Sequence, residues 1–349
     1  MTLAGGARSG PLPAGLDLVA ERPLLASAID VRFRLAPGDR LLVDQGTNVS
    51  VGMPLAERFR DTFLAEGRLP PGLGSRPGDR WTPPPATGRR ATRIQAEGEL
   101  LFEWRDAWRI ATGEHVDPVD APIAGIVRRA RPGVGITLRA AGRVLLGDAA
   151  LGGPSRGRLE LAAGPGGELR PGGLDVGLAG TVLVVGSRVD AETLTRARAM
   201  GVRGVGVAGL PSKERRDYVA SEARQRAALH RLPPFAVFVL DGALRRPIAS
   251  PVVRLLEALV GREVAIVNDP PALVFDDADL DLPWPPADLV RVRSGPEAGR
   301  EGRWMGLVGL RRFGRGVQLE AAEVRFADGP AIVPVGDLER FAGRPGAAQ

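Results

Sequence analysis

Residues 289–308 read LVRVRSGPEAGREGRWMGLV, and this stretch decides the fold of the C-terminal region. Val290 and Val292 alternate with arginines, a pattern typical of a half-buried β-strand. Gly295 and Pro296 predict a turn, and further glycines follow four and seven positions after Gly295. An apolar pair then begins a second strand. The stretch therefore predicts a hairpin whose tight turns depend on glycine.

The same stretch resembles the KOW motif, in which an apolar strand, glycines spaced G-x-x-x-G-x-x-G and a second apolar strand follow one another. The matching glycines here are Gly295, Gly299 and Gly302. The versions in transcription elongation factors and ribosomal proteins are the most similar, including the closing residues 334–340. The resemblance implies an SH3-like barrel over residues 288–344 that docks onto RNA, a ribosome or RNA polymerase.

Arginines and aromatic residues gather in this predicted barrel. Basic side chains beside aromatic rings suit contact with phosphates and stacking on bases. The predicted nucleic-acid-binding residues are Arg291, Arg293, Arg300, Arg303, Trp304, Arg311, Arg312, Phe313 and Arg315. Two other interpretations stay open. The arginines could form a solvated face, and Trp304, which stands where the family carries Val or Ile, could pack in the core.

The composition limits the classes of function. The chain has 349 residues, and 47 basic against 41 acidic side chains give a net charge of +6, with Lys213 as the single lysine. Excess arginine indicates an anionic partner or, alternatively, a compositional bias with surface ion pairs. The absence of cysteine excludes disulfides, thiolate metal sites and cysteine nucleophiles. Two isolated histidines offer no ligand set, so we expect no metal, no cofactor and no catalytic residue.

The sequence also bears on the cellular location. No apolar run reaches the ~18 residues that a membrane-spanning helix needs. Residues 1–18 lack the charged and apolar regions of a signal peptide. We therefore expect a cytoplasmic protein without a membrane partner.

The N-terminal region predicts a β domain. Residues 1–30 read as a flexible arm, residues 31–151 as short strands, and residues 69–90 as a long Pro- and Gly-rich loop. The segment that begins Ala121-Pro-Ile-Ala-Gly-Ile-Val resembles the barrel-sandwich hybrid of biotinyl and lipoyl carriers. The carrier lysine is missing, because Lys213 lies outside this region. The resemblance thus implies a structural relative and not a carrier.

The spacing of apolar residues changes in the central region. Gly- and Pro-rich residues 152–173 read as a linker, and an α/β domain with a parallel sheet is predicted over residues 174–275. The expected strands and helices alternate along this domain. They are strands at 181–185, 202–210, 235–240 and 264–267, and helices that begin near Asp190, Ser212 and Pro251.

Ligands of parallel sheets bind beyond the carboxyl ends of the strands. The candidate ligand-binding residues there are Gly186, Ser187, Arg188, Asp241 and Asn268. No G-x-G-x-x-G follows the first strand, and no Walker sequence occurs. A small-ligand or enzymatic site at this edge is therefore an alternative function.

Together these patterns predict a multidomain α+β protein with a β domain, an α/β domain and a C-terminal barrel. The whole chain looks similar to bacterial KOW-containing proteins, a resemblance that names no reaction. The leading hypothesis is a non-enzymatic protein that binds RNA or the transcription and translation machinery. A protein–protein scaffold is the second alternative, so protein partners stay open.

Overall fold

The structure is a computed structural model that describes residues 12–27, 29–66, 76, 78–81, 98–104, 107–113, 115–228, 232–276 and 284–342. The chain divides into two units. Met1–Ser27 and Gly142–Gln349 form the first unit, and Ala28–Ala141 form the second. Strands dominate the described residues, which include three α-helices and several open sheets. This agrees with the predicted multidomain α+β class.

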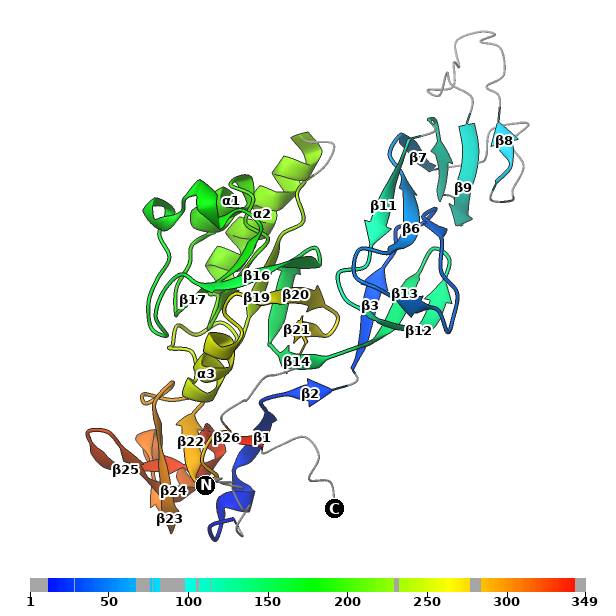
Figure 1. The fold of residues 1–349 in the computed structure, drawn as a ribbon. Helices are drawn as coiled ribbons and strands as arrows, with labels where there is room; N and C mark the ends of the chain where they lie inside the picture. Colours follow the sequence, from blue (N-terminus) through cyan, green and yellow to red (C-terminus); the bar gives the residue numbers. More distant parts are fainter. Residues whose placement is uncertain are drawn as a thin grey trace, which may run out of the picture. The chain divides into compact units, whose positions relative to one another are not determined.

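The first unit contains a nine-stranded sheet (Figure 1). Its strands, in spatial order, are β15 (Ala149–Gly152), β19 (Ala236–Val239), β18 (Gly204–Val207), β17 (Thr181–Val185), β16 (Ser155–Leu161), β20 (Glu263–Asn268), β21 (Pro271–Phe275), β14 (Arg143–Leu146) and β2 (Ala26–Ser27). The pairs among β16, β17, β18 and β19 are parallel, and the other pairs are antiparallel. Three of the four strands predicted for the parallel sheet, β17, β18 and β19, are parallel. The fourth, β20, instead runs antiparallel to β16 and β21, so the sheet is mixed.

Three helices cover this sheet: α1 (Ala191–Ala199), α2 (Ser212–Ala228) and α3 (Ser250–Ala258). Every residue of β17 is buried, because its two faces pack against different cores. Leu183 and Val185 join the core that includes residues of α1 and α2, whereas Val182 and Val184 join the core that includes α3. Alternation along a strand produces this division.

Strands β14, β15 and β16 correct the predicted domain boundaries. We expected residues up to 151 in the N-terminal β domain and residues 152–173 in a linker. Instead residues 143–161 supply three strands of the nine-stranded sheet, and β16 pairs with β17 and β20. Gly157 and its two neighbouring arginines hid a strand that packs mainly through Leu159, which is fully buried.

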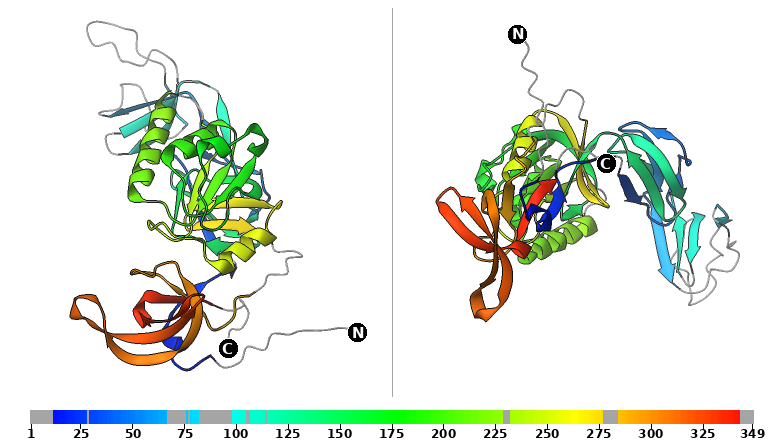
Figure 2. Two further views of the ribbon diagram at one scale, coloured as in Figure 1. Left: turned by 90° about the vertical axis from the view of Figure 1, so that its left-hand side faces the viewer. Right: turned by 90° about the horizontal axis from the view of Figure 1, so that it is seen from below.

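A six-stranded sheet forms the C-terminal part of the first unit (Figure 2). Its order is β1 (Ala20–Pro23), β26 (Leu338–Ala342), β22 (Leu289–Val292), β23 (Glu301–Arg312), β24 (Gln318–Phe326) and β25 (Gly329–Pro334). No pairing within the described part of the chain closes it into a barrel. Gly295 and Gly299 adopt φ of 81° and 93° at the turn after β22, as the motif predicts. At Gly302 a Cβ would lie 2.7 Å from the Arg325 carbonyl oxygen, so β23 needs glycine there.

The N-terminal residues correct a second prediction. Residues 12–27 belong to the expected flexible arm, yet they contribute to both cores of the first unit. Leu16 and Val19 pack in the core of the six-stranded sheet, while Leu24 and Leu25 pack in the core beneath α3. Between these pairs, β1 runs parallel to β26. Apolar pairs on both sides of a short strand therefore fix this segment.

The second unit consists of three small sheets. The first has the order β3 (Asp30–Arg34), β13 (Gly135–Ala140), β12 (Gly125–Arg131) and β5 (Asn48–Val49). The second has the order β11 (Val116–Asp120), β6 (Pro54–Phe59) and β4 (Arg40–Leu41). The third has the order β7 (Thr62–Glu66), β10 (Ala107–Ala111), β9 (Gly98–Trp104) and β8 (Arg80–Trp81). Inward side chains such as Val31, Phe33 and Leu138 are buried. The predicted long loop at residues 69–90 lies almost wholly outside the described residues.

Five short 3₁₀ helices complete the described elements. They are η1 (Leu16–Leu18), η2 (Pro171–Gly173), η3 (Val176–Leu178), η4 (Gly314–Gly316) and η5 (Val335–Asp337).

Candidate functional site

The hairpin of β23 and β24 reaches beyond its neighbouring strands. Strand β22 pairs with β23 only at residues 301–303, and β25 pairs with β24 only at residues 321–326. Among the described strands, none therefore pairs with residues 310–320 from outside the hairpin, and we call this part the distal ribbon. Figure 2 shows the hairpin in orange. Both faces of such a two-stranded ribbon are open to a partner.

The distal ribbon carries a net positive charge. Residues 310–320 contain three arginines and one acidic residue, Glu320, which lies opposite Leu310 in the hairpin. Arg311 and Arg312 are exposed, and within the described chain neither forms an ion pair. The Arg311 guanidinium donates only to the neighbouring Leu310 carbonyl, at 3.2 Å. The expected contact residue Arg315 lies in η4 at the turn, and Phe313 is half-buried beside it.

Two further arginines lie face to face at the base of the hairpin. Arg303 of β23 is directly opposite Arg325 of β24, and both are exposed. Like charges in opposite positions destabilise a sheet. In the part of the chain that the structure describes, Arg303 forms one ion pair, with Asp288 at 3.7 Å. Arg311 pairs with Leu319, six positions from Arg325 on the same strand, so the three arginines share one face.

Arg325 was not among the predicted contact residues. Its sequence neighbours are ordinary for an amphipathic strand, and only the register of β23 against β24 places it beside Arg303. No local sequence signal indicates this pairing.

Two predicted contact residues are buried, and we correct their roles. The side chain of Arg291 is 1% exposed, so it cannot reach a nucleic acid. Trp304 is 5% exposed in the core of the six-stranded sheet, and its indole N–H donates to the Ala14 carbonyl at 3.3 Å. Trp304 alternates with the exposed Arg303 and Met305 and so points into the core. Arg291 lies on the opposite face of β22 from Val290 and Val292, and it is buried there against Asp241.

Two other predicted contact residues have partners inside the chain. Arg300 forms ion pairs with Glu297 and Asp328, and its guanidinium lies 4.1 Å from the ring centroid of Phe326. Arg293 is half-exposed, with its guanidinium 3.9 Å from Glu339. These contacts neutralise part of the charge that the linear sequence displays.

Arg291 belongs to a buried ion cluster at the junction of the two sheets. Asp241, at the end of β19, accepts hydrogen bonds from Arg291 at 2.7 Å and from Arg22 of β1. Burial alone would raise the pKa of Asp241, but the charges and hydrogen bonds of Arg291 and Arg22 lower it below 3.8. Asp241 was a candidate ligand-binding residue. It instead joins the N-terminal segment, the α/β part and the C-terminal sheet.

The remaining candidate ligand-binding residues also contact the chain itself. The Ser187 hydroxyl donates to the Gly166 carbonyl at 2.9 Å, and a Cβ on Gly186 would lie 2.2 Å from the Gly164 carbonyl oxygen. Arg188 forms an ion pair with Glu168, and the Asn268 amide donates to the Gly152 carbonyl at 3.1 Å. The loop around Gly166 therefore occupies the edge where a ligand was expected.

The amide groups at the start of α1 are likewise occupied. Asp190 accepts from the Thr193 amide at 2.7 Å, which confirms its predicted capping role. Glu214 accepts from the Ala191 amide at 3.2 Å. Carboxylates of the chain thus already fill the positions that a bound phosphate would take.

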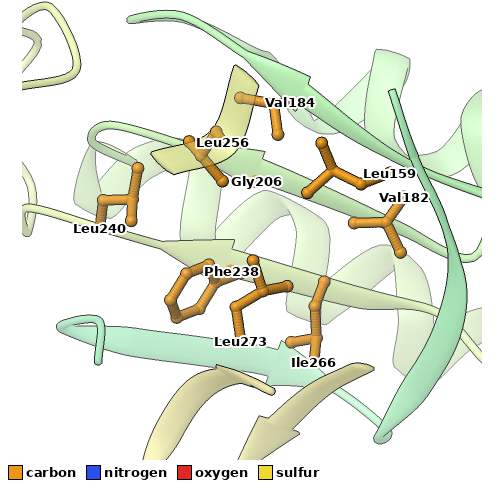
Figure 3. Close-up of a pocket in the computed structure, with 9 residues that line it drawn as sticks. All are labelled: Leu159, Val182, Val184, Gly206, Phe238, Leu240, Leu256, Ile266 and Leu273. Atoms are coloured by element: carbon orange, nitrogen blue, oxygen red, sulfur yellow. The ribbon is translucent and has the colours of Figure 1, made fainter. Parts of the chain in front are cut away.

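Two hollows among the described residues can be compared with the predicted sites. A cavity of about 10 Å³ lies between the sheet and α3, and Figure 3 shows its apolar lining around Gly206. A cleft of about 540 Å³ in the second unit contains Asp39 and Arg40, whose charges are paired with Arg58 and with Glu57 and Glu99. Among the described residues no group of His, Asp and Glu side chains is arranged to hold a metal ion. In the same part of the chain, no helix has the length and apolar character to cross a membrane.

The chain matches no protein-family model, no curated protein and no solved structure.

Proposed function

We propose that the chain is a non-enzymatic cytoplasmic protein that binds RNA, alone or within a ribosome or RNA polymerase, through its C-terminal sheet. The observation that carries this proposal is the net positive charge of the distal ribbon, which has three arginines and one glutamate. Arg311 and Arg312 project there without a carboxylate partner in the described chain. Guanidinium groups bind phosphates in a bidentate manner, and bound phosphates account for most nonspecific affinity.

The proposal includes a fold for each β region. We assign residues 288–344 to an SH3-like module of the KOW kind, supported by the glycine-dependent turn after β22 and by the core around Trp304. We assign the sheets that contain β12 and β13 to a barrel-sandwich hybrid. The pairing of Gly125 with both Val49 and Ala140 supports this second assignment, because it joins the two halves of the predicted motif.

A titration of the full chain with labelled single-stranded RNA over a range of salt concentrations tests the function. The double variant Arg311→Ala/Arg312→Ala should lose two phosphate contacts, which lowers the log–log salt slope by about 1.4. The matched control is Arg215→Ala/Arg216→Ala, an exposed arginine pair on α2. Equal effects of the two variants, or no binding at physiological salt, would contradict the proposal.

A protein partner is the second candidate function, and a specific observation favours it. Leu310, Val317 and Leu319 of the distal ribbon are exposed, Leu310 to 61%. Exposed apolar side chains beside arginines are typical of protein interfaces as well. If the double variant keeps RNA affinity while Leu310→Ser abolishes co-purification of one defined protein, the ribbon is a protein-docking element.

A further inference from the structure

A second basic surface lies on the unit formed by Ala28–Ala141. Strands β3, β13 and β12 form one sheet whose inner face packs on the core through side chains such as Phe33 and Ile136. The outer face carries arginines from two distant parts of the sequence. We call it the arginine face, and its members are Arg32, Arg34, Arg128, Arg129, Arg131 and Arg139.

Strand register places these arginines in rows. Arg32 of β3 and Arg129 of β12 both pair with Thr137 of β13, from opposite sides. In the next row, Arg34 and Arg131 both pair with Gly135. Strands lie about 4.8 Å apart and alternate residues about 6.8 Å apart, so the Cα atoms of the four arginines mark the corners of an area of roughly 10 by 7 Å.

Short residues, one of them polar, occupy the centre of this array. Thr137 offers a hydroxyl group between the first pair of arginines. Gly135 has φ of 155°, and a Cβ there would lie 2.4 Å from the Phe33 carbonyl oxygen. Position 135 thus leaves the backbone bare between Arg34 and Arg131. A phosphate could approach the sheet closely at this point.

Charge on the arginine face is almost uncompensated. Asp30 is the single carboxylate among these strands' outward residues, and it pairs with Arg139 at 2.5 Å. Its pKa is lowered by that hydrogen bond and by the nearby charges of Arg128 and Arg32. The other five arginines form no ion pair within the described chain. Thr137 or Gly135 separates the two arginines of each row, and no ion pair accounts for the gathering of these arginines on one face.

Elsewhere in the same unit, arginines do have carboxylate partners. Arg58 pairs with Asp39 at 2.6 Å, and Arg60 pairs with Asp117 at 2.5 Å. A general arginine bias would give paired side chains like these across the whole surface. The arginine face departs from that pattern.

We propose that the arginine face binds the phosphate backbone of nucleic acid without reading its sequence. Guanidinium forks and the Thr137 hydroxyl match phosphate oxygens, which are the main contacts in sequence-independent binding. No aromatic side chain points outward from these three strands, so bases have no stacking platform. Ile126, opposite Arg139, is the exposed apolar side chain of this face, and no aromatic or leucine side chain lies beside it on the three strands. This disfavours an anionic membrane, because membrane-binding surfaces insert several such groups.

This surface is separate from the distal ribbon and goes beyond the function proposed above. It was hidden in the sequence because Arg32 and Arg129 are 97 positions apart. Only the pairing of β3 and β12 with the same strand brings them into one row.

The test uses the full chain and the variant Arg32→Gln/Arg34→Gln/Arg129→Gln/Arg131→Gln. Its matched control removes four exposed charges from α2 in the variant Lys213→Gln/Arg215→Gln/Arg216→Gln/Arg224→Gln. Both are titrated with single-stranded RNA of two unrelated sequences, with a DNA duplex and with phosphatidylserine vesicles, over a range of salt concentrations.

The proposal predicts that the quadruple variant of the face lowers the log–log salt slope for RNA by about 2.8, equally for both sequences, and the control does not. The melting temperature of the variant should stay the same or rise, because charge repulsion is removed. The two half variants, Arg32→Gln/Arg34→Gln and Arg129→Gln/Arg131→Gln, should each give about half of the effect, and they serve if the quadruple variant fails to fold.

Two outcomes would overturn it. One is equal salt slopes for the face variant and the α2 control with both kinds of nucleic acid. The other is a loss of vesicle binding alone, which would assign the face to a membrane surface. Arg311 and Arg312 are intact in these variants. A negative result for the arginine face therefore leaves RNA binding by the distal ribbon to be tested separately.

Discussion

Arg291 donates to Asp241 at 2.7 Å with both side chains almost fully buried, and this contact joins the C-terminal sheet to the end of β19. Arg22 supplies a second guanidinium to the same carboxylate. The Arg246 guanidinium lies 4.0 Å from the Asp241 carboxylate, and the Glu339 carboxylate lies 3.8 Å from the Arg291 guanidinium. A carboxylate between arginines in this setting is costly to remove, because the cations then remain buried without compensation.

Asp241→Asn should therefore destabilise the first unit by about 3–5 kcal/mol. Asparagine keeps the shape of the side chain and removes its charge, so packing changes little. Urea denaturation at neutral pH measures the effect. The control is Asp328→Asn, which breaks an exposed ion pair with Arg300 and should cost no more than about 1 kcal/mol. Similar losses of unfolding free energy for both variants would show that the buried ion cluster stabilises the fold no more than an exposed ion pair does.

The same carboxylate predicts a pH dependence. Its folded pKa lies below the unfolded value of 3.8, so its contribution to stability is present above that value. This contribution is lost as the pH falls through the lower folded pKa. The stability difference between the native chain and Asp241→Asn should thus be largest at neutral pH and shrink in acid. A difference that is constant down to about pH 3 would contradict this assignment.

Residues 12–27 should be required for the C-terminal sheet to fold. Leu16 is fully buried in that core, and Leu16→Ala should cost about 2–5 kcal/mol. Leu18, two positions along and 57% exposed, provides the control, since Leu18→Ala should change stability by less than about 0.5 kcal/mol.

A fragment of the last sixty or so residues extends the test. It lacks β1, Leu16 and Val19, so circular dichroism and proton NMR should find it unfolded. Adding a peptide of residues 12–27 should restore structure. An independently folded fragment would show that the N-terminal segment is dispensable.

The sequence predicted the elements whose signals are local. The apolar run at 181–185, the Asp190 cap and the helix that Pro251 begins all occur as expected, because propensity and capping act within a few residues. The start of the helix at Ser212 was also correct.

Long-range pairing set the features that sequence reasoning missed. Strand β1 exists because β26 lies beside it, more than 300 positions later. The burial of Arg291 depends on Asp241, and the arginine face depends on the register of three strands. Periodicity carries no information about such partners. Only some of the arginines between residues 291 and 315 therefore lie on the surface as predicted.

The cavity beside Gly206 leads to a prediction of increased stability. Gly206 lies in β18 with ordinary backbone angles, and a Cβ there would be 3.8 Å from the nearest atom, Cγ2 of Val184. The cavity of about 10 Å³ that it lines is apolar (Figure 3). Gly206→Ala should raise the free energy of unfolding by about 0.4–1 kcal/mol, because alanine restricts the unfolded chain.

Gly204 on the same strand provides the opposite control. A Cβ there would lie 2.7 Å from Cδ1 of Ile266 and 3.0 Å from the Ala236 carbonyl oxygen. Gly204→Ala should therefore destabilise the chain by about 1–3 kcal/mol through overpacking. Both variants lose a glycine from β18, so the unfolded state changes equally, and only the native packing differs. Urea midpoints that move in the same direction for both variants would show that the space beside Gly206 does not determine the outcome.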